Sequence, residues 1–360
     1  MILMVADLHL HPHKQLDKID PETGQSCRLR RGFDVLDWIF KVAYDEDAKA
    51  IVFAGDTLHV KHKIDTEVLS ELSLLLAMHA PNIPCFFIAG NHEQYGSVTS
   101  LDALQHIPGV TVVDVARQEI IDGNVIDMIP FVESKADFDA QVSLLPSFFS
   151  NMKYGFNYLI THLSVWGGKP GSSEYVTKEA IHPQCFAKLG YNKVFTGHYH
   201  NMQSLNKKGD QTTVERGFVH YLGSPLHQDR SNAEATPVIW LLREDGISFK
   251  ENKISPRFVK ARWGALQRIG NAAGALIRNN YVDVYLGDER PGSEEIKKFM
   301  DRFQPAAYEV FIEEKEKESA PIIKGVRANP SNAIKQYVAS QRQSKRFTRA
   351  GLRFLGRVKE

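Results

Sequence analysis

Residues 85–93 read Cys85-Phe86-Phe87-Ile88-Ala89-Gly90-Asn91-His92-Glu93. The apolar residues at the start of this stretch predict a short buried strand. Gly90 then allows the backbone to turn sharply, and an amide, an imidazole and a carboxylate follow it directly. Open α/β sheets bind their ligands at the carboxyl ends of the strands. The stretch therefore predicts an α/β fold with a functional site at the end of this strand.

The composition is that of an ordinary globular protein. The chain has 360 residues, 43% hydrophobic and 24% charged, which allows a large core and more than one domain. Its three cysteines are far apart and form no CxxC pair, which argues against a cysteine zinc site and fits a reducing cytoplasm. The apolar start has no basic region and ends at Asp7, so it predicts a strand and not a signal peptide. No apolar run approaches the ~20 residues that span a bilayer, so we expect no membrane contact.

Strands and helices are predicted to alternate from the start of the chain. Apolar strands at 2–6, 50–54 and 85–89 are separated by helices at 33–43 and 65–79. This order predicts a parallel sheet covered on both faces. Further helices are predicted at 98–106 and 135–149, and further strands at 110–115, 125–131, 158–161, 193–196 and 219–222.

The later part of the chain divides into two more segments. Residues 238–242 and 247–250 flank Glu244-Asp245-Gly246 and predict a hairpin. The composition then changes near Ser255-Pro256, and strands at 281–286 and 308–312 with a helix after Ser293 predict a small second unit. From Arg327 onward the chain has six arginines and three lysines against one acidic residue, and it predicts a basic amphipathic helical tail.

Five of the predicted strands end in potential metal ligands. These residues are Asp7, His9, Asp56, Asn91, His92, His162, His198 and His200. Each group alone is more often structural, but parallel strands bring their carboxyl ends to one edge of a sheet. The two carboxylates, the amide and four of the five imidazoles suit two borderline divalent ions such as manganese, iron or zinc, whereas calcium and magnesium prefer more oxygen ligands. Asp56 lies between the two ligand sets and is the natural bridging carboxylate.

The five groups resemble, in order, the signature blocks of the calcineurin-like metallophosphoesterases: Asp7-x-His9, Gly55-Asp56, Gly90-Asn91-His92-Glu93, His162 and Gly197-His198-x-His200. The resemblance implies a two-sheet β-sandwich flanked by helices. It implies one ion held by Asp7, His9, Asp56 and His200, and a second held by Asp56, Asn91, His162 and His198. Manganese is the expected metal, with magnesium, iron or zinc as alternatives.

In this family His92 would contact the phosphate or its leaving oxygen and would not bind metal. Two ions roughly 3.5–4 Å apart act on both sides of an in-line displacement, and a protonated His92 serves as general acid. The chain departs from the family where it has Thr161 before His162 and Glu93 in place of Asp. The longer Glu93 carboxylate could still accept the ring N–H of His92.

Outside the site, the chain resembles the SbcD type of DNA repair nuclease subunit. The similar features are Tyr221-x-Gly223-Ser224-Pro225, the hairpin and the small unit. The resemblance implies a catalytic domain (1–255), a small α+β capping domain that guides DNA (256–320) and a helical tail (328–360) that binds an SbcC-type ATPase. It also implies a homodimer formed through the helices at 65–79 and 98–106, in the cytoplasm of a bacterial or phage-infected cell.

Basic residues interleaved with aromatics suit contact with a phosphate backbone, and an amphipathic helix suits docking on a partner. Candidate DNA contacts are Lys260, Arg262, Arg268 and Arg278. Candidate partner contacts are Tyr337, Arg346, Phe347, Phe354 and Leu355. A solvated charged surface is the alternative interpretation of both sets.

We therefore expect a metal-dependent DNA exo- or endonuclease, the nuclease subunit of an SbcC–SbcD-like recombination and repair complex. One alternative is a phosphatase or small nucleotide phosphodiesterase, which would need neither the tail nor the small unit. Another is a non-catalytic scaffold of the same fold, which would have lost ligands. The remaining histidines near the motifs fit no ligand position and are interpreted as loop or surface residues: His11, His13, His59, His62 and His79.

Overall fold

The computed structural model describes residues 1–61, 63–96, 98–146, 155–171 and 180–312. The predicted tail, 328–360, and residues 313–320 of the predicted second unit lie outside the described residues. The same holds for His62 and for the candidate partner contacts Tyr337, Arg346, Phe347, Phe354 and Leu355.

A six-stranded sheet contains the strands predicted at the start of the chain. In spatial order its strands are β15 (Gly246–Glu251), β14 (Val238–Arg243), β1 (Ile2–Val5), β2 (Ala50–Ala54), β3 (Cys85–Ile88) and β6 (Val110–Val113). The four strands from β1 to β6 are parallel, and β14 and β15 form the predicted antiparallel hairpin. The parallel pairing brings the carboxyl ends of β1, β2 and β3 to one edge of the sheet.

A second, seven-stranded sheet faces the first. Its strands, in spatial order, are β12 (Gln211–Thr212), β11 (Gln203–Leu205), β13 (Val219–Tyr221), β10 (Lys193–Thr196), β9 (Asn157–Thr161), β8 (Asn124–Ile129) and β7 (Arg117–Ile121). Fully buried residues of both sheets form one core cluster, with Met4 and Val52 from the first and Ile160 and Phe195 from the second. The expected two-sheet sandwich is therefore confirmed.

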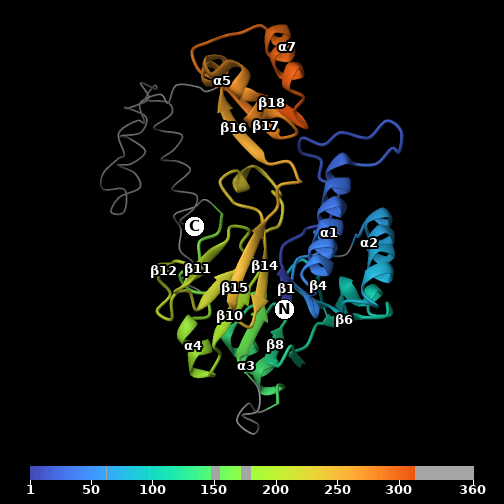
Figure 1. Cartoon of the computed structure of the whole chain (residues 1–360), viewed down its shortest axis with the longest axis vertical. Helices are drawn as coiled ribbons and strands as arrows, with labels where there is room; N and C mark the ends of the chain where they lie inside the picture. Colours follow the sequence, from blue (N-terminus) through green and yellow to red (C-terminus); the bar gives the residue numbers. More distant parts are fainter. Residues whose placement is uncertain (62, 97, 147–154, 172–179, 313–360) are drawn as a thin grey trace, which may run out of the picture.

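Helices cover the outer faces of both sheets (Figure 1). On the first sheet lie α1 (Cys27–Asp45) and α2 (Thr66–His79), each capped by a side-chain oxygen at its N-terminus, from Ser26 and Asp65 respectively. The second sheet is covered by α3 (Lys135–Ser143) and α4 (Pro183–Lys188). These helices bury their apolar sides against the sheets, which explains the helical spacing in the sequence.

The helix predicted at 98–106 is wrong. Val98–Thr99 form a short strand, β5, which pairs with β4 (Gln94–Tyr95), and only η1 (Ser100–Leu104) is a short 3-10 helix. The β-branched residues Val98 and Thr99 favour extended backbone. The Thr99 hydroxyl also accepts the backbone N–H of Leu101 at 3.3 Å, which starts the 3-10 turn.

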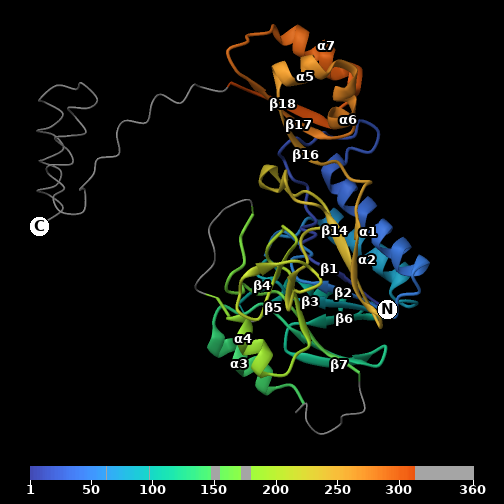
Figure 2. The same ribbon diagram turned by 60° about the vertical axis from the view of Figure 1, so that its left-hand side comes forward.

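A small three-stranded sheet follows the sandwich. Its elements are β16 (Phe258–Arg262), α5 (Trp263–Ile269), η4 (Gly270–Ala273), α6 (Gly274–Ile277), β17 (Tyr281–Leu286), α7 (Ser293–Phe303) and β18 (Ala307–Ile312). All three strands are parallel and alternate with helices, which is an α/β arrangement and not the expected α+β one. Sequence patterns missed β16, because this edge strand exposes Lys260 and Arg262 and has no continuous apolar run. Figures 1 and 2 show the small unit at one end of the molecule, with α5 and α7 on its side away from the sandwich.

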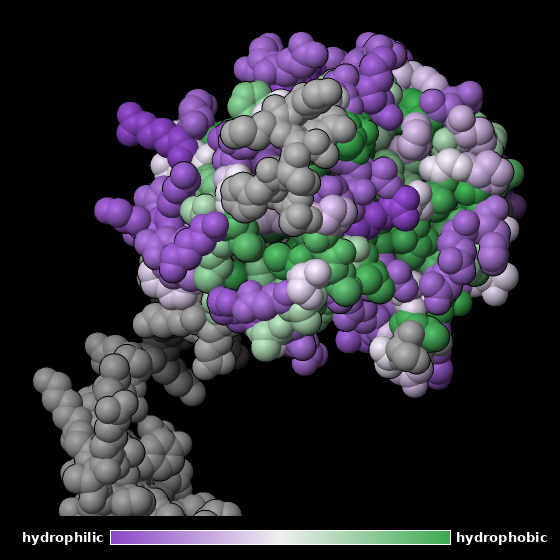
Figure 3. Space-filling model, turned by 90° about the horizontal axis from the view of Figure 1, so that it is seen from below, coloured by the Kyte–Doolittle hydropathy of each residue, from purple (hydrophilic) through white to green (hydrophobic). Residues whose placement is uncertain are grey.

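The opposite end of the molecule carries α3 and β7 (Figure 2). Seen from this side, hydrophobic residues form a band across an otherwise polar surface (Figure 3). Exposed large hydrophobic residues on these segments include Ile120 and Leu144. Single exposed hydrophobic side chains are ordinary on folded proteins. Among the described residues, no helix combines the length and apolar character needed to cross a membrane.

Candidate metal centre

The predicted ligands lie where the carboxyl ends of both sheets meet. Asp7 and His9 follow β1, Asp56 follows β2, and Asn91 and His92 follow β3. His162 directly follows β9 in the second sheet, and His198 and His200 follow β10. The sandwich therefore brings together residues from five strand ends, as expected from the parallel pairing.

The backbone at this edge is strained. Asp7, His9, Asp56 and His198 have positive φ angles of 56°, 47°, 51° and 84°. Residues other than glycine rarely adopt this left-handed region, and such strain concentrates at functional sites. The close packing at this edge also requires glycine at position 90, because a Cβ atom added at Gly90 would lie 2.2 Å from Asp56 Oδ1.

One set of donor atoms gathers around the two carboxylates. His9 Nε2 lies 3.7 Å from Asp56 Oδ2, and His200 Nε2 lies 4.0 Å from Asp7 Oδ1. The Nε2 atoms of His9 and His200 are 3.1 Å apart. The ligand atoms of Asp7, His9 and His200 all lie within 4.8 Å of one another. These atoms therefore converge closely enough to share one cation.

A second set gathers around Asn91. Its Oδ1 atom lies 3.1 Å from His162 Nε2 and 2.9 Å from His198 Nδ1. His162 Nε2 also lies 3.3 Å from Asp56 Oδ2, so Asp56 touches both sets. His162 Nδ1 donates to the carbonyl oxygen of Ala54 at 2.8 Å, which turns Nε2 toward the site. The Asp56 carboxylate therefore lies close to both sets of donor atoms.

The electrostatics of the site favour a bound cation. Burial raises the pKa of Asp7 and lowers the pKa of His9. Burial, together with the charge of His162, lowers the pKa of His198 to about 3. Burial alone would lower the pKa of His162, but Asp56 and Asp7 outweigh it and raise that pKa to about 10. Without a metal, a charged His162 therefore balances Asp56. Two carboxylates, one amide oxygen and neutral imidazoles in a buried site fit divalent ions of borderline softness.

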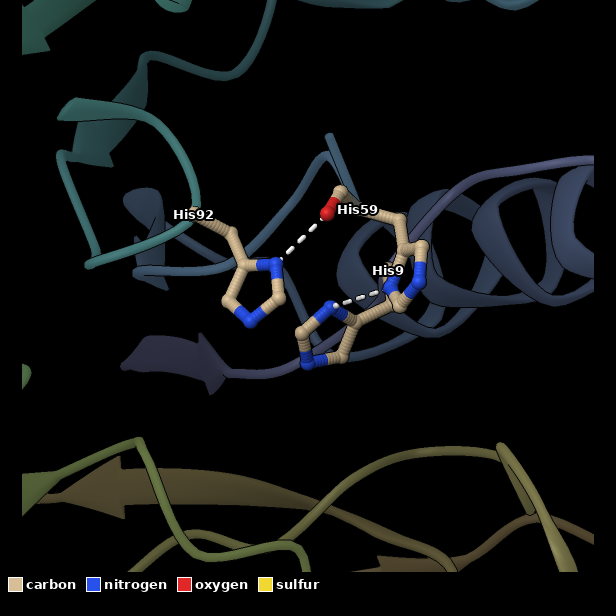
Figure 4. Close-up of side chains that lie close together, drawn as sticks. All are labelled: His9, His59 and His92. Carbon is tan, nitrogen blue, oxygen red and sulfur yellow. Dashed lines mark hydrogen bonds between the residues drawn. The ribbon is translucent and has the colours of Figure 1, made fainter. Parts of the chain in front are cut away.

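His92 is oriented by a different residue from the one expected. Its Nδ1 atom donates to the carbonyl oxygen of His59 at 2.5 Å, as Figure 4 shows, and not to the carboxylate of Glu93. Its Nε2 atom is left facing Asp56 Oδ2 at 4.0 Å. The earlier expectation that Glu93 could accept the His92 ring N–H is therefore wrong, because Glu93 is occupied elsewhere.

Glu93 is fully buried and holds two loops together. Its Oε2 atom accepts the backbone N–H groups of Asp56 at 2.9 Å and of Gly90 at 2.8 Å. Its Oε1 atom accepts the N–H of Leu58 at 2.8 Å. Burial and the nearby Asp56 raise the pKa of Glu93 to about 8. The only sequence signal for this role is the position of Glu93 next to His92.

His59 lies in a loop, as expected, but its ring packs beside the site. Its Nδ1 atom lies 3.3 Å from His9 Nδ1, and its ring stacks on that of His92 with centroids 5.3 Å apart (Figure 4). The ligand atoms of His9, His59 and His92 lie within 4.8 Å of one another. His13 is also half-buried beside the site, with Nε2 3.1 Å from the His9 carbonyl oxygen. The one available signal was that His59 follows Asp56 by three residues in the same loop.

A cavity of about 340 Å³ opens onto these residues. Its lining includes metal-ligand candidates and a second group of residues outside the family motifs: His13, Lys14, Gln15, Arg28, His59, Gln228 and Asp229. The size is that of an ordinary small-molecule or substrate site. His11 stands further out, with its ring centroid 5.1 Å from that of His59, whereas His79 lies far from the site at the end of α2, stacked on Phe40.

The candidate DNA contacts do not form one cluster. Lys260 and Arg262 are exposed on β16, two residues apart and therefore on the same face of the strand. Arg268, in the last turn of α5, and Arg278, after α6, are exposed on the helical side of the small unit. Any surface that uses all four residues would have to reach around the small unit.

The sequence of this chain matches the model of one protein family. The sequence model of the calcineurin-like phosphoesterases matches residues 1–202. A DNA double-strand break repair protein, Mre11 of Methanosarcina mazei, is 28% identical over 106 residues, which is 29% of this chain and only 16% of that protein. Among solved structures, a dimetal phosphatase from Danio rerio is 12% identical, with 69% of this chain and 95% of that chain covered and a TM-score of 0.43. The phosphoesterase Yfce from E. coli is 10% identical, with 69% and 90% covered and a TM-score of 0.31.

Proposed function

Since the chain belongs to the calcineurin-like phosphoesterase family, we propose that it hydrolyses the phosphodiester bonds of DNA as a metal-dependent nuclease. The family has a dinuclear metal site and acts on phosphoesters, and the candidate ligands for such a site are present here. The observation that carries the proposal is the contact of Asp56 with both ligand sets, 3.7 Å from His9 and 3.3 Å from His162.

The candidate ligands divide between two ions. Asp7, His9, Asp56 and His200 would hold the first, and Asp56, Asn91, His162 and His198 would hold the second. When bound, the two ions polarise the phosphoryl oxygens and acidify a water molecule. Manganese is the proposed metal, because nitrogen and oxygen donors are mixed in both sets.

His92 is the proposed general acid. Its Nδ1–H is held by the His59 carbonyl oxygen, which leaves Nε2 facing the site. From there the imidazolium can protonate the oxygen that leaves phosphorus. His59 positions the ring of His92 through this hydrogen bond and through stacking.

DNA is preferred over a small phosphoester for two reasons. The partial likeness to Mre11 of Methanosarcina mazei, a DNA double-strand break repair protein, supports DNA as the substrate. Arg28, which lines the cavity, also contacts Phe258 and Tyr281 of the small unit. We assign to this unit a guiding role for DNA. A phosphatase or small nucleotide phosphodiesterase is the second candidate, favoured by the compact cavity of about 340 Å³.

The proposed setting is an SbcC–SbcD-like repair complex in the cytoplasm. The tail, 328–360, would bind the ATPase subunit. A homodimer would form through α2, where Leu74 and Met78 are 62% and 52% exposed. Exposed hydrophobic side chains on one helix fit a helix-to-helix contact between two copies.

The test compares three substrates with manganese, with magnesium and with a chelator: linear double-stranded DNA, single-stranded DNA and bis-p-nitrophenyl phosphate. We expect manganese-dependent cleavage of DNA, lost in Asp56→Asn and kept in Asp245→Asn, whose side chain is exposed in the hairpin. Hydrolysis of the small ester with no cleavage of either DNA would favour the second candidate. No hydrolysis of any substrate would favour a scaffold.

A further inference from the structure

The small parallel sheet has one face that its own helices leave uncovered. Val282, Val284 and Leu286 of β17 point into the core formed with α5 and α7. The alternate residues point to the opposite face, and the strand register aligns them in three rows. We call these the inner row (Phe258, Tyr281, Ala307), the middle row (Lys260, Asp283, Glu309) and the outer row (Arg262, Tyr285, Phe311).

The inner row is buried against the sandwich beside the cavity. Its residues pack with Leu16 and Ala233. The guanidinium carbon of Arg28 lies 5.4 Å from the ring centroid of Phe258 and 5.3 Å from that of Tyr281. Arg28 also lines the cavity of the metal centre. The open face of the small sheet therefore begins at the rim of the proposed active site.

The middle row is largely neutralised by one arginine from the sandwich. Arg230 Nε donates to Asp283 Oδ2 at 2.6 Å, and a second nitrogen of Arg230 pairs with Glu309. The same guanidinium lies 5.0 Å from the ring centroid of Phe311. Arg230 thus offsets both carboxylates, which would otherwise repel a phosphate backbone, and it fixes the ring of Phe311.

The outer row carries an aromatic pair outside any core. The rings of Tyr285 and Phe311 stack with centroids 5.2 Å apart and an interplanar angle of 22°. Both side chains are half-buried, and Arg262 is exposed on the neighbouring strand. Aromatic rings on a sheet face beside basic side chains are a common way to bind unpaired bases, since every base has a flat face that can stack. Bases in a duplex are already stacked on one another.

We propose that the outer row binds the bases of an unpaired DNA strand that leads to the metal centre, with Lys260 and Arg262 contacting its phosphates. This proposal rests on the proposed nuclease function and deepens it by naming single-stranded DNA as the bound form. Along β17, the four residue steps from Tyr281 to Tyr285 span ~13 Å, a length that a few nucleotides of a strand can cover. The aromatic pair guides the strand and takes no part in the chemistry.

The experiment measures binding with the full chain in the presence of a chelator, so that cleavage is suppressed. Fluorescence anisotropy follows three labelled probes of equal length: a single-stranded thymidine oligonucleotide, the same backbone with abasic sites, and a duplex. The variants are Tyr285→Leu and Phe311→Leu, which keep apolar bulk and remove the aromatic face. The matched control is Phe249→Leu, a similarly exposed aromatic side chain on β15.

We expect each variant to bind the thymidine strand about tenfold more weakly than the parent chain does, within the range of a stacking contact. Binding of the abasic strand and of the duplex should be unchanged, and Phe249→Leu should match the parent on all probes. Equal binding of the thymidine strand by parent and variants would overturn the proposal. An equal loss of affinity for the abasic strand would also overturn the proposal, because the rings would then contribute to binding without stacking on bases.

The two proposals fail in different ways. If the parent chain cleaves DNA with manganese but both leucine variants bind the thymidine strand normally, the stacking proposal alone is wrong. If the parent chain cleaves no DNA, the nuclease proposal is wrong, and the binding assay still reports on the aromatic pair. Thermal unfolding of each variant checks that the small unit is intact.

Discussion

The carboxylate of Glu93 accepts the backbone N–H of Asp56 across a distance of 2.9 Å, although the two residues follow different strands. The same oxygen accepts the N–H of Gly90 at 2.8 Å. Asp56 is the carboxylate that touches both ligand sets, so its position depends on Glu93. A buried acid that binds no metal therefore positions the residue on which the whole site depends.

Replacing Glu93 by glutamine tests this dependence. Glu93→Gln keeps the shape of the side chain but replaces one acceptor oxygen by a donor, which leaves at least one buried N–H unpaired. We expect the free energy of unfolding to fall by about 2 kcal/mol and manganese to bind more weakly. Urea unfolding and calorimetric titration measure the two effects, with Glu244→Gln in the exposed hairpin as control. Unchanged metal affinity would show that Asp56 does not need this hydrogen bond.

Replacing His92 separates metal binding from catalysis. His92→Ala should bind two metal ions as the parent chain does, because the ring is not among the proposed ligands. Cleavage should fall by about 10²- to 10⁴-fold, the usual contribution of a general acid. Metal content after desalting and initial cleavage rates test this prediction. The exposed His106 gives the control, His106→Ala, and normal cleavage by His92→Ala would refute the assigned role.

Metal should stabilise the fold through the same ligands. A ligand that binds only the folded chain at a free concentration of 100 times its Kd adds about 2.7 kcal/mol to the free energy of unfolding. We therefore expect manganese to raise Tm, a chelator to reverse the rise, and Asp56→Asn to abolish it. Differential scanning calorimetry makes the comparison. The idea fails if Asp56→Asn and Asp245→Asn gain the same stability from manganese.

His220, a buried residue of β13 outside the proposed ligand set, should make stability depend on pH. Burial lowers its pKa to about 3 from the ordinary value of 6.5, and its Nδ1 atom lies 2.9 Å from Ser204 Oγ. Between these values the unfolded chain binds a proton that the folded chain does not. Stability is therefore full above pH 6.5 and falls as pH falls, by about 2 kcal/mol between pH 7 and pH 5 from this residue alone.

The test compares how steeply the free energy of unfolding changes with pH in the parent chain and in a variant. The free energy of unfolding of the parent chain and of His220→Gln is measured by urea unfolding from pH 7 to pH 5. Other buried histidines contribute equally to the pH dependence of both proteins. The free energy of unfolding of the variant should therefore fall by about 2 kcal/mol less than that of the parent chain between pH 7 and pH 5. Parallel curves would mean that His220 has the same pKa in the folded and the unfolded chain.

Some features of the fold and site were predictable because their signals are local. A buried parallel strand is a short apolar run, and the residue at which it ends can be read directly from the chain. The strands that end before Asp7, Asp56 and Asn91 were found in this way. Strand β16 and the turn at 98–104 were not, because an edge strand with exposed Lys260 lacks that pattern and β-branched residues interrupt the expected helix.

The sequence by itself determined the strand ends and the residues able to hold two cations, since parallel pairing brings such ends together whatever the loops do. The two-sheet sandwich was expected only from the resemblance to the family. Only the tertiary structure decided which groups touch. It placed Glu93 on backbone N–H groups, set His59 against His92, and joined the small sheet to the cavity through Arg28. These contacts join residues that periodicity does not relate. They depend on the path of each loop and on side-chain rotamers, which are settled only when the whole chain packs.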